Sequence, residues 1–174
     1  MGLGDADFDG LVDLESTWNY LDTGEDLGSD WMANDFDDLN WSSGDAELGY
    51  GDGDEATVVS YGDDAANKHT TTYFRQSFEY EGEDADGVSG LLRLRRDDGA
   101  VVYLNGEELL RSNMPEVAID ASTCAATEMI GNGESSLNEY MVQLDLLEGT
   151  NVIAVEVHQI NFTSSDISFD LELL

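Results

Sequence analysis

Two adjacent carboxylates, on Asp97 and Asp98, stand where a strand-like run ends and Gly99 opens a turn. Carboxylate oxygens suit calcium, but this ion takes about six to eight oxygen ligands, so two side chains are too few. The loop from Asn161 to Asp166 follows a second strand-like run and offers further oxygens. We therefore expect both loops to lie at one end of the fold and together to form its ligand-binding or metal-binding end. In the alternative, the two aspartates only cap backbone N–H groups in a tight turn.

The N-terminal residues 5–10 read DADFDG, which matches the first half of an EF-hand calcium loop. The match then fails, because Ser16 stands where that loop needs a bidentate glutamate. We therefore expect residues 1–16 to form an acidic linker or N-terminal extension.

Candidates for direct contact with a ligand are aromatic or polar. Trp31 and Trp41 lie among polar residues, so we expect exposed rings on which the apolar face of a sugar can stack. Asn161 belongs to the loop described above. His158 alternates with apolar neighbours on its strand and is expected at a surface or on a sheet face, where it can form hydrogen bonds.

Arginines are scarce, and Arg93 and Arg95 fall on one face of one predicted strand. A pair of guanidinium groups there could bind sugar carboxylates or sulfates, because arginine makes bidentate contacts with oxyanions. In the structural alternative, the pair neutralises carboxylates on neighbouring strands, such as those of Glu79 or Glu156.

The elements that must position these residues are strands. Apolar and polar residues alternate with a period of two, as in antiparallel sheets with one buried face. The pattern predicts strands at 17–21, 57–61, 72–80, 89–96, 100–104, 107–111, 139–146, 151–159 and 166–173. Asn105 and Gly106 supply the positive φ angles of a two-residue hairpin turn. Helix is expected only as turns near 29–33 or 121–129, and the predicted core contains Phe74, Phe78, Ile153, Val155, Val157, Phe169 and Leu171.

Several phrases carry a family resemblance. They are RDDGAVVYLNGEELLRSNMP (96–115), WNYLDTG (18–24), FDDLNW (36–41), LGYGDG (48–53), TTYFR (71–75) and GTNVIAVEVHQ (149–159). In this order they resemble jelly-roll β-sandwich modules of the galactose-binding-like type, which accompany secreted polysaccharide-degrading enzymes. The hairpin is also similar to flocculin-type adhesin domains, in which two successive aspartates hold a calcium ion that contacts sugar.

The resemblance implies a single all-β, antiparallel jelly-roll sandwich over residues 17–174. It also implies a structural calcium near the first strands, for which the pair Asp37 and Asp38 is the best candidate. Solvated loop carboxylates are the alternative for that pair.

Composition limits the function. The chain has 39 acidic and 6 basic residues and a net charge of −33, which excludes a nucleic-acid binder because phosphate neutralisation needs a basic surface. Such charge is typical of halophilic proteins, and an acidic secreted domain that binds divalent cations is the alternative. No apolar run reaches the length of about 20 residues that spans a bilayer, so membrane insertion is not expected. The start has no signal peptide, and we expect a piece of a longer secreted chain.

Together these observations predict a non-catalytic, glycan-binding accessory or adhesion module of a secreted protein. Calcium is its expected cofactor, and enzyme or surface domains are expected to be fused to it. The alternative is a structural module for surface assembly, in which calcium bridges copies. No catalytic constellation can be named from the sequence, because acids are too abundant for any choice among them to be meaningful.

Overall fold

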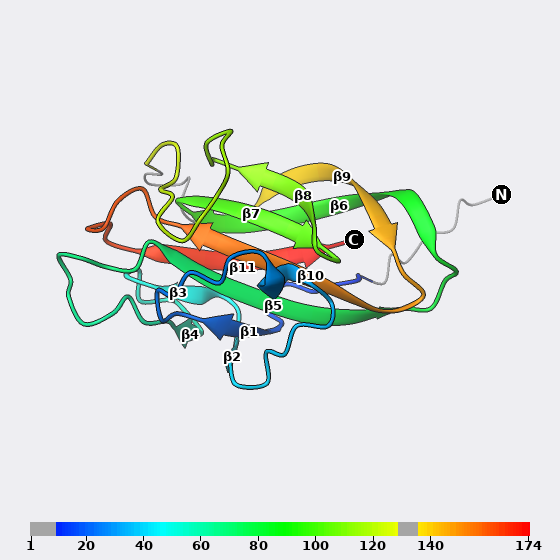
Figure 1. Ribbon diagram of the computed structural model, residues 1–174, viewed down its shortest axis with the longest axis horizontal. Coiled ribbons are helices and arrows are strands. Elements are labelled where there is room, and N and C mark those ends of the chain that lie inside the picture. Colours follow the sequence, from blue (N-terminus) through cyan, green and yellow to red (C-terminus); the bar gives the residue numbers. More distant parts are fainter. Residues whose placement is uncertain (1–9, 129–135) are drawn as a thin grey trace.

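The computed structural model describes residues 10–128 and 136–174, which form two β-sheets packed face to face (Figure 1). Sheet A has the strand order β4-β3-β11-β6-β9, and sheet B has the order β2-β1-β5-β10-β7-β8. The strands are β1 (Thr17–Leu21), β2 (Ser42–Asp45), β3 (Leu48–Tyr50), β4 (Thr57–Val58), β5 (Thr71–Tyr80), β6 (Ala85–Asp97), β7 (Gly99–Leu104), β8 (Glu107–Ser112), β9 (Asn138–Leu146), β10 (Gly149–His158) and β11 (Ile167–Leu173). One 3-10 turn, η1 (Asp30–Met32), lies between β1 and β2. The predicted all-β sandwich in a single domain is confirmed.

The main core lies between the two sheets and follows the period of the strands. On β11, Ile167, Phe169 and Leu171 face inward and are buried, whereas Glu172 faces outward. All seven predicted core residues are buried. Phe169 stacks on Phe74 of sheet B with ring centroids 4.2 Å apart, and Trp18 meets it edge-on at 4.9 Å. Aromatic contacts thus join the two sheets at the centre of the molecule.

The hairpin between β7 and β8 has the predicted turn. Asn105 has a φ of 52° and Gly106 a φ of 89°, the left-handed conformation that both central positions of a type I′ turn require. The Asn105 side chain donates to Asn151 Oδ1 at 2.8 Å, and its own oxygen accepts from the Val152 N–H at 3.0 Å. The turn is therefore tied to the beginning of β10 as well as to its own strands.

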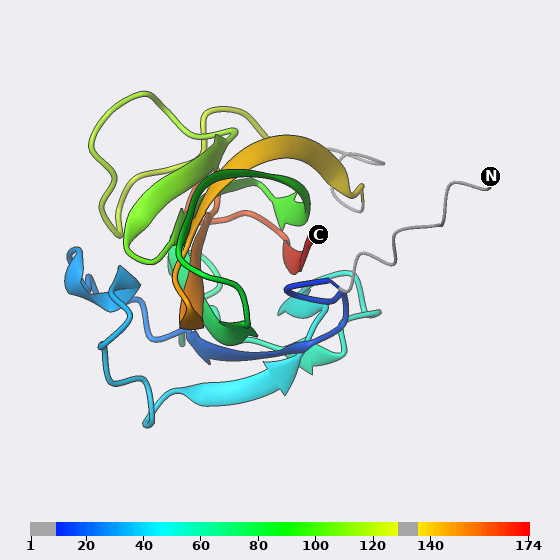
Figure 2. The same cartoon turned by 90° about the vertical axis from the view of Figure 1, so that its right-hand side faces the viewer.

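Sheet B is covered on its outer face by a second apolar layer. This layer contains buried Trp31, Tyr73, Val101, Tyr103, Met114, Ala125 and Ala154. It is contributed by strands of sheet B and by the segments 22–41 and 113–128, which lie on the same side of the molecule in Figure 2. Strand β10 is consequently buried on both faces from Asn151 to His158.

Some elements differ from the expectation. Strands β2 and β3 were not predicted, β4 is only two residues long, and β6 begins at Ala85, before the predicted strand 89–96. Neighbouring strands pair antiparallel except β3 and β4, which are parallel. The turn near 29–33 exists as η1, whereas residues 121–128 form no helix.

The N-terminal segment packs on the sandwich before the predicted module boundary at residue 17. Val12 is buried and bridges Leu173 at the end of β11. The acidic phrase with Asp5, Asp7 and Asp9 lies outside the described residues. No helix in the described part of the chain is long and apolar enough to cross a membrane.

The central aromatic contact gives a prediction for stability. Replacing Phe169 by Ala should lower the free energy of unfolding by about 3–5 kcal/mol, because it leaves a cavity between Trp18 and Phe74. The measurement is denaturant-induced unfolding followed by tryptophan fluorescence. Leu39→Ala is the control: Leu39 is 87% exposed, and its loss should cost less than about 0.5 kcal/mol. Equal costs for the two variants would contradict the proposed core.

Candidate functional site at the Asp97 end

The Asp97–Asp98 turn and the loop after β10 meet at one end of the sandwich, as the sequence predicts. Asp97, the last residue of β6, lies opposite Ser168 of β11. Gly99, the first residue of β7, lies opposite His158, the last residue of β10. At this end of the sandwich, β6 and β10 finish and β7 and β11 begin. We call it the Asp97 end.

Asp98 connects the turn to the loop that follows β10. Its Oδ2 accepts a hydrogen bond from the Ile160 N–H at 2.7 Å. Its carbonyl oxygen accepts from Arg96 Nη1 at 2.8 Å and from Asn113 Nδ2 at 2.9 Å. Asp97 and Asp98 are each 1% exposed. The turn is therefore a buried, hydrogen-bonded base beneath the loop 160–166.

The loop itself presents side chains to solvent. Asn161 is exposed, and its Oδ1 accepts from the N–H and the hydroxyl of Thr163 at 2.8 and 2.7 Å. Asp166 is half-buried, and its Oδ1 accepts from Ser165 Oγ at 2.6 Å. Phe162 between them is 48% exposed. Sequence reasoning missed Phe162, although a lone aromatic residue in the polar phrase NFTSS was a usable signal.

The only lysine of the chain braces this loop. Lys68 Nζ donates to the carbonyl oxygen of Ser164 at 2.5 Å, and its backbone N–H donates to the carbonyl of Phe162 at 2.9 Å. The ammonium group also lies 4.8 Å from the ring centroids of both Tyr50 and Tyr61. Such cation–π contacts add to the hydrogen bonds. The Lys68 ammonium group thus holds the loop in place beneath its exposed face.

Calcium remains a prediction. Among residues 10–128 and 136–174, no group of three or more His, Cys, Asp or Glu side chains is close enough to hold a metal ion. A site at the Asp97 end would therefore need Asn161 and carbonyl oxygens besides the two aspartates. The second candidate pair is used otherwise: Asp38 Oδ2 accepts from Arg75 Nε at 2.8 Å, and Asp37 Oδ1 accepts from the Leu39 N–H at 3.1 Å.

The two tryptophans are not the exposed rings that their polar surroundings suggested. Trp31 is 1% exposed and meets the rings of Tyr73 and Tyr103 edge-on, at 4.8 and 5.8 Å. Trp41 is half-buried against Phe36, with ring centroids 5.8 Å apart. Trp31 is a core residue of the second apolar layer, because segment 22–41 folds over sheet B and removes its ring from solvent.

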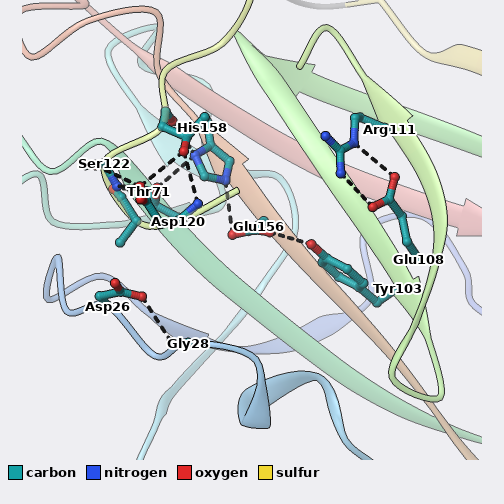
Figure 3. Close-up of polar contacts among 12 residues, drawn as sticks. Asp26, Gly28, Thr71, Tyr103, Glu108, Arg111, Asp120, Ser122, Glu156 and His158 are labelled. Atoms are coloured by element: carbon teal, nitrogen blue, oxygen red, sulfur yellow. Dashed lines mark hydrogen bonds and ion pairs between the residues drawn. The ribbon is translucent and has the colours of Figure 1, made fainter. Parts of the chain in front are cut away.

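His158 lies on a sheet face, one of its two expected places, and makes polar contacts there (Figure 3), but it is buried rather than at the surface. Its Nδ1 lies 2.7 Å from the carbonyl oxygen of Thr123 and 2.9 Å from Thr71 Oγ1, so Nδ1 carries the proton that the carbonyl accepts. Nε2 lies 3.1 Å from Glu156 Oε2, at an ion-pair distance without hydrogen-bond alignment. Glu156 Oε1 accepts from the Tyr103 hydroxyl at 2.6 Å. Burial, together with the nearby Glu156 carboxylate, raises the pKa of Tyr103 above its ordinary value. This row of polar groups joins β5, β10 and β7 beneath segment 113–128.

Arg93 and Arg95 lie on the outer face of sheet A, and carboxylates on that sheet neutralise them. Arg93 Nε is 3.0 Å from Glu139 Oε1, and its Nη1 is 2.7 Å from Glu172 Oε2. Arg95 Nη1 pairs with Glu47. The structural alternative was therefore right in kind, but its partners were wrong: Glu79 binds Thr150, and Glu156 belongs to the His158 row.

No protein-family model matches this chain, and no curated protein does. Solved structures do match. A glycosyl hydrolase family 2 member from Bacteroides cellulosilyticus has a TM-score of 0.54 and 14% identity, covering 91% of this chain and 20% of that one. Bacteroides uniformis beta-glucuronidase 2 has a TM-score of 0.52 and 15% identity, covering 91% of this chain and 17% of that one.

These matches show a shared β-sandwich fold and no more, because the identities are low. The chain spans about a fifth or less of the length of these glycosidases. The similarity therefore concerns one part of a much longer protein in each case.

The bracing of the loop by Lys68 can be tested. Lys68→Met keeps the length of the side chain and removes the charged donor, so the Ile160 N–H should exchange with solvent about tenfold faster, since hydrogen bonds to charged groups contribute about 1.5–3 kcal/mol. Hydrogen–deuterium exchange followed by NMR measures this rate. The matched control is Asp63→Ala, at an exposed position nearby. An unchanged Ile160 rate in Lys68→Met would mean that the lysine does not hold the loop.

Proposed function

We propose that this chain is a non-catalytic, glycan-binding module of a larger carbohydrate-active protein and that it binds glycan at the Asp97 end. The observation that carries the proposal is the exposed Phe162 beside Asn161, on a loop held from below by Asp98 and Lys68. The shared fold with parts of family 2 glycosidases supports an association with carbohydrate.

The chemistry of this end suits a sugar. A half-exposed aromatic ring can stack on the apolar face of a pyranose, and an adjacent amide can exchange hydrogen bonds with its hydroxyls. The Asn161 amide nitrogen is available for this, because the internal hydrogen bonds of the loop use the Oδ1 atom. A loop that is already ordered loses little conformational entropy on binding, which favours affinity.

The proposal also includes a calcium ion at the Asp97 end. Asp97, Asp98 and Asn161 would provide oxygen ligands, with carbonyl oxygens of the two loops and water completing the shell. An ion there would link the turn to the ligand loop and could contact sugar hydroxyls directly. Asp37 and Asp38 are not part of this proposal, because Asp38 pairs with Arg75.

The acidic composition suggests where the module works. With a net charge of −33, the folded chain repels itself at low ionic strength, and salt relieves that repulsion. At molar salt the screening length falls to about 3 Å. We therefore propose that the module works in a saline environment.

Loss of the exposed ring should weaken binding. Phe162→Ala should reduce retention on immobilised polysaccharide about tenfold, since an aromatic contact of this kind contributes more than about 1 kcal/mol. Affinity electrophoresis over a panel of neutral and acidic polysaccharides measures the retention. The control, Leu39→Ala, removes an exposed apolar side chain that lies outside the loop. If wild type is retained and Phe162→Ala equals it, the ligand does not lie on this loop.

Salt and calcium should stabilise the protein separately. The melting temperature should rise with sodium chloride, and about 5 mM calcium should raise it further than sodium of equal ionic strength, since extracellular calcium modules have Kd values of about 10⁻⁴–10⁻³ M. Asp98→Asn should abolish the calcium increment and keep the sodium response. Equal melting temperatures in calcium and in the matched sodium buffer would remove the calcium part of the proposal.

A further inference from the structure

A polar cavity of about 330 Å³ opens on the outer face of sheet A, separate from the loop 160–166. Its walls come from four parts of the chain: the segment before β1, the segment around β3, strand β6 and strand β11. The polar lining residues are Glu15, Glu47, Asp54, Arg95 and Asp170, with Ala56 beside them. The volume lies at the small end of ligand pockets, which range over about 300–1,000 Å³.

The polar groups of the cavity are held in fixed positions. Asp170 lies directly opposite Arg95 across the sheet and is 4% exposed. The Leu171 N–H donates to Asp170 Oδ1 at 2.8 Å, and the Glu15 N–H lies 3.2 and 3.3 Å from its two oxygens. Glu47 accepts from Arg95 Nη1 on one oxygen and from Ser168 Oγ on the other. The site is therefore built before any ligand arrives.

Arg95 is not saturated by these contacts. Its Nη1 pairs with Glu47, whereas its Nε is buried without a hydrogen-bond partner among the described residues. Arg93, two positions earlier on the same face, differs: two carboxylates hold its Nε and Nη1. Both guanidinium groups keep unused N–H donors, but the one in the cavity keeps more of them, because Nη1 is its one paired nitrogen among the described residues, and its side chain is 26% exposed.

The charge of the lining selects the kind of ligand. Four carboxylates and one guanidinium leave three negative charges when all are ionised. That balance repels sugar carboxylates and sulfates, the ligands that the arginine pair first suggested. A cation is disfavoured by the guanidinium and by the existing hydrogen bonds of Glu47 and Asp170. A neutral, hydroxyl-rich ligand fits best, because each hydroxyl can donate to a carboxylate and accept from arginine.

We propose that this cavity is a second binding site, which takes one neutral sugar unit through hydrogen bonds to Arg95 and Asp170. The inference rests on the proposed glycan-binding function and adds to it the class of sugar and a separate location. The size and the fixed polar groups together limit the occupant to about one monosaccharide ring.

The affinity of the cavity for a neutral sugar should depend on whether Asp170 is ionised. Burial raises the pKa of this carboxyl from its ordinary value to about 6, although N–H groups of Glu15 and Leu171 favour the charged form. The charged groups that face it are Glu15 from the N-terminal segment, Glu47 and Asp54 from the segment around β3, and Arg95 from β6. Affinity for a neutral sugar should rise as pH increases through about 6, because the ionised carboxylate is the stronger hydrogen-bond acceptor. Asp170→Asn should remove that rise.

The test compares four proteins by ligand-observed NMR with glucose, galactose, N-acetylglucosamine and glucuronate, alongside polysaccharide retention. Arg95→Gln removes the donor, and Ala56→Leu fills the cavity without changing its charge. Each should weaken the binding of a neutral monosaccharide about tenfold, as for the loss of one good interaction. The matched control, Arg93→Gln on the same face of the same strand, should bind like wild type. Because Ala56 is exposed, Ala56→Leu remains decisive if Arg95→Gln does not fold.

The outcomes separate this inference from the proposed function. If polysaccharide retains the wild type but Ala56→Leu binds every monosaccharide equally well, the cavity is not a site and the proposed function stands. Tighter binding of glucuronate than of any neutral sugar overturns the assigned ligand class. If wild type binds no saccharide in either assay, the proposed function fails and the inference fails with it.

Discussion

The scarcity of positive charge constrains how this chain is held together. Only six lysine and arginine side chains accompany 39 carboxylates. Five of the six connect segments far apart in the sequence, whereas Arg111 pairs with Glu108 and with the nearby carbonyls of Pro115 and Val117. Arg75 fixes η1 to β5 through the carbonyls of Trp31 and Ala33 as well as through Asp38. Arg96 ties β6 to Ser112 at the end of β8, and Lys68 secures the ligand loop. Because six cations cannot neutralise 39 carboxylates, a charge excess of 33 remains, and salt can screen it where those carboxylates are exposed to solvent.

The strands were predictable from alternating apolar and polar residues wherever one face is buried and the other is exposed to solvent. Strand β9 alternates in burial from Tyr140 to Leu146, and its predicted bounds differ by one residue from the observed ones. Strands β2 (Ser42–Asp45) and β3 (Leu48–Tyr50) gave no such signal. The first is a polar edge strand, and the second has three residues, all buried. Both exist because neighbouring strands supply hydrogen bonds, which no local pattern records.

The candidate site was partly predictable for a geometric reason. Turns that follow strands of one sense lie at one end of a sandwich, so Asp98 and Asn161 could be brought together from strand order alone. The exposure of the aromatic side chains could not be predicted from strand order. Trp31 sits in a polar phrase and is buried by segment 22–41, whereas Phe162 sits in a similar phrase and is exposed. The difference lies in the second apolar layer, whose existence depends on contacts between distant segments.

That second layer also sets how freely the sequence can vary. A strand with one wet face tolerates exchange at alternate positions, as β9 should between Tyr140 and Leu146. Strand β10 has no wet face from Asn151 to His158, so its inward and outward positions are restricted alike. Divergence among homologous chains should therefore show a period of two along β9 and none along β10. Substitutions that accumulate over evolutionary time should gather on sheet A, leaving the middle of sheet B nearly unchanged.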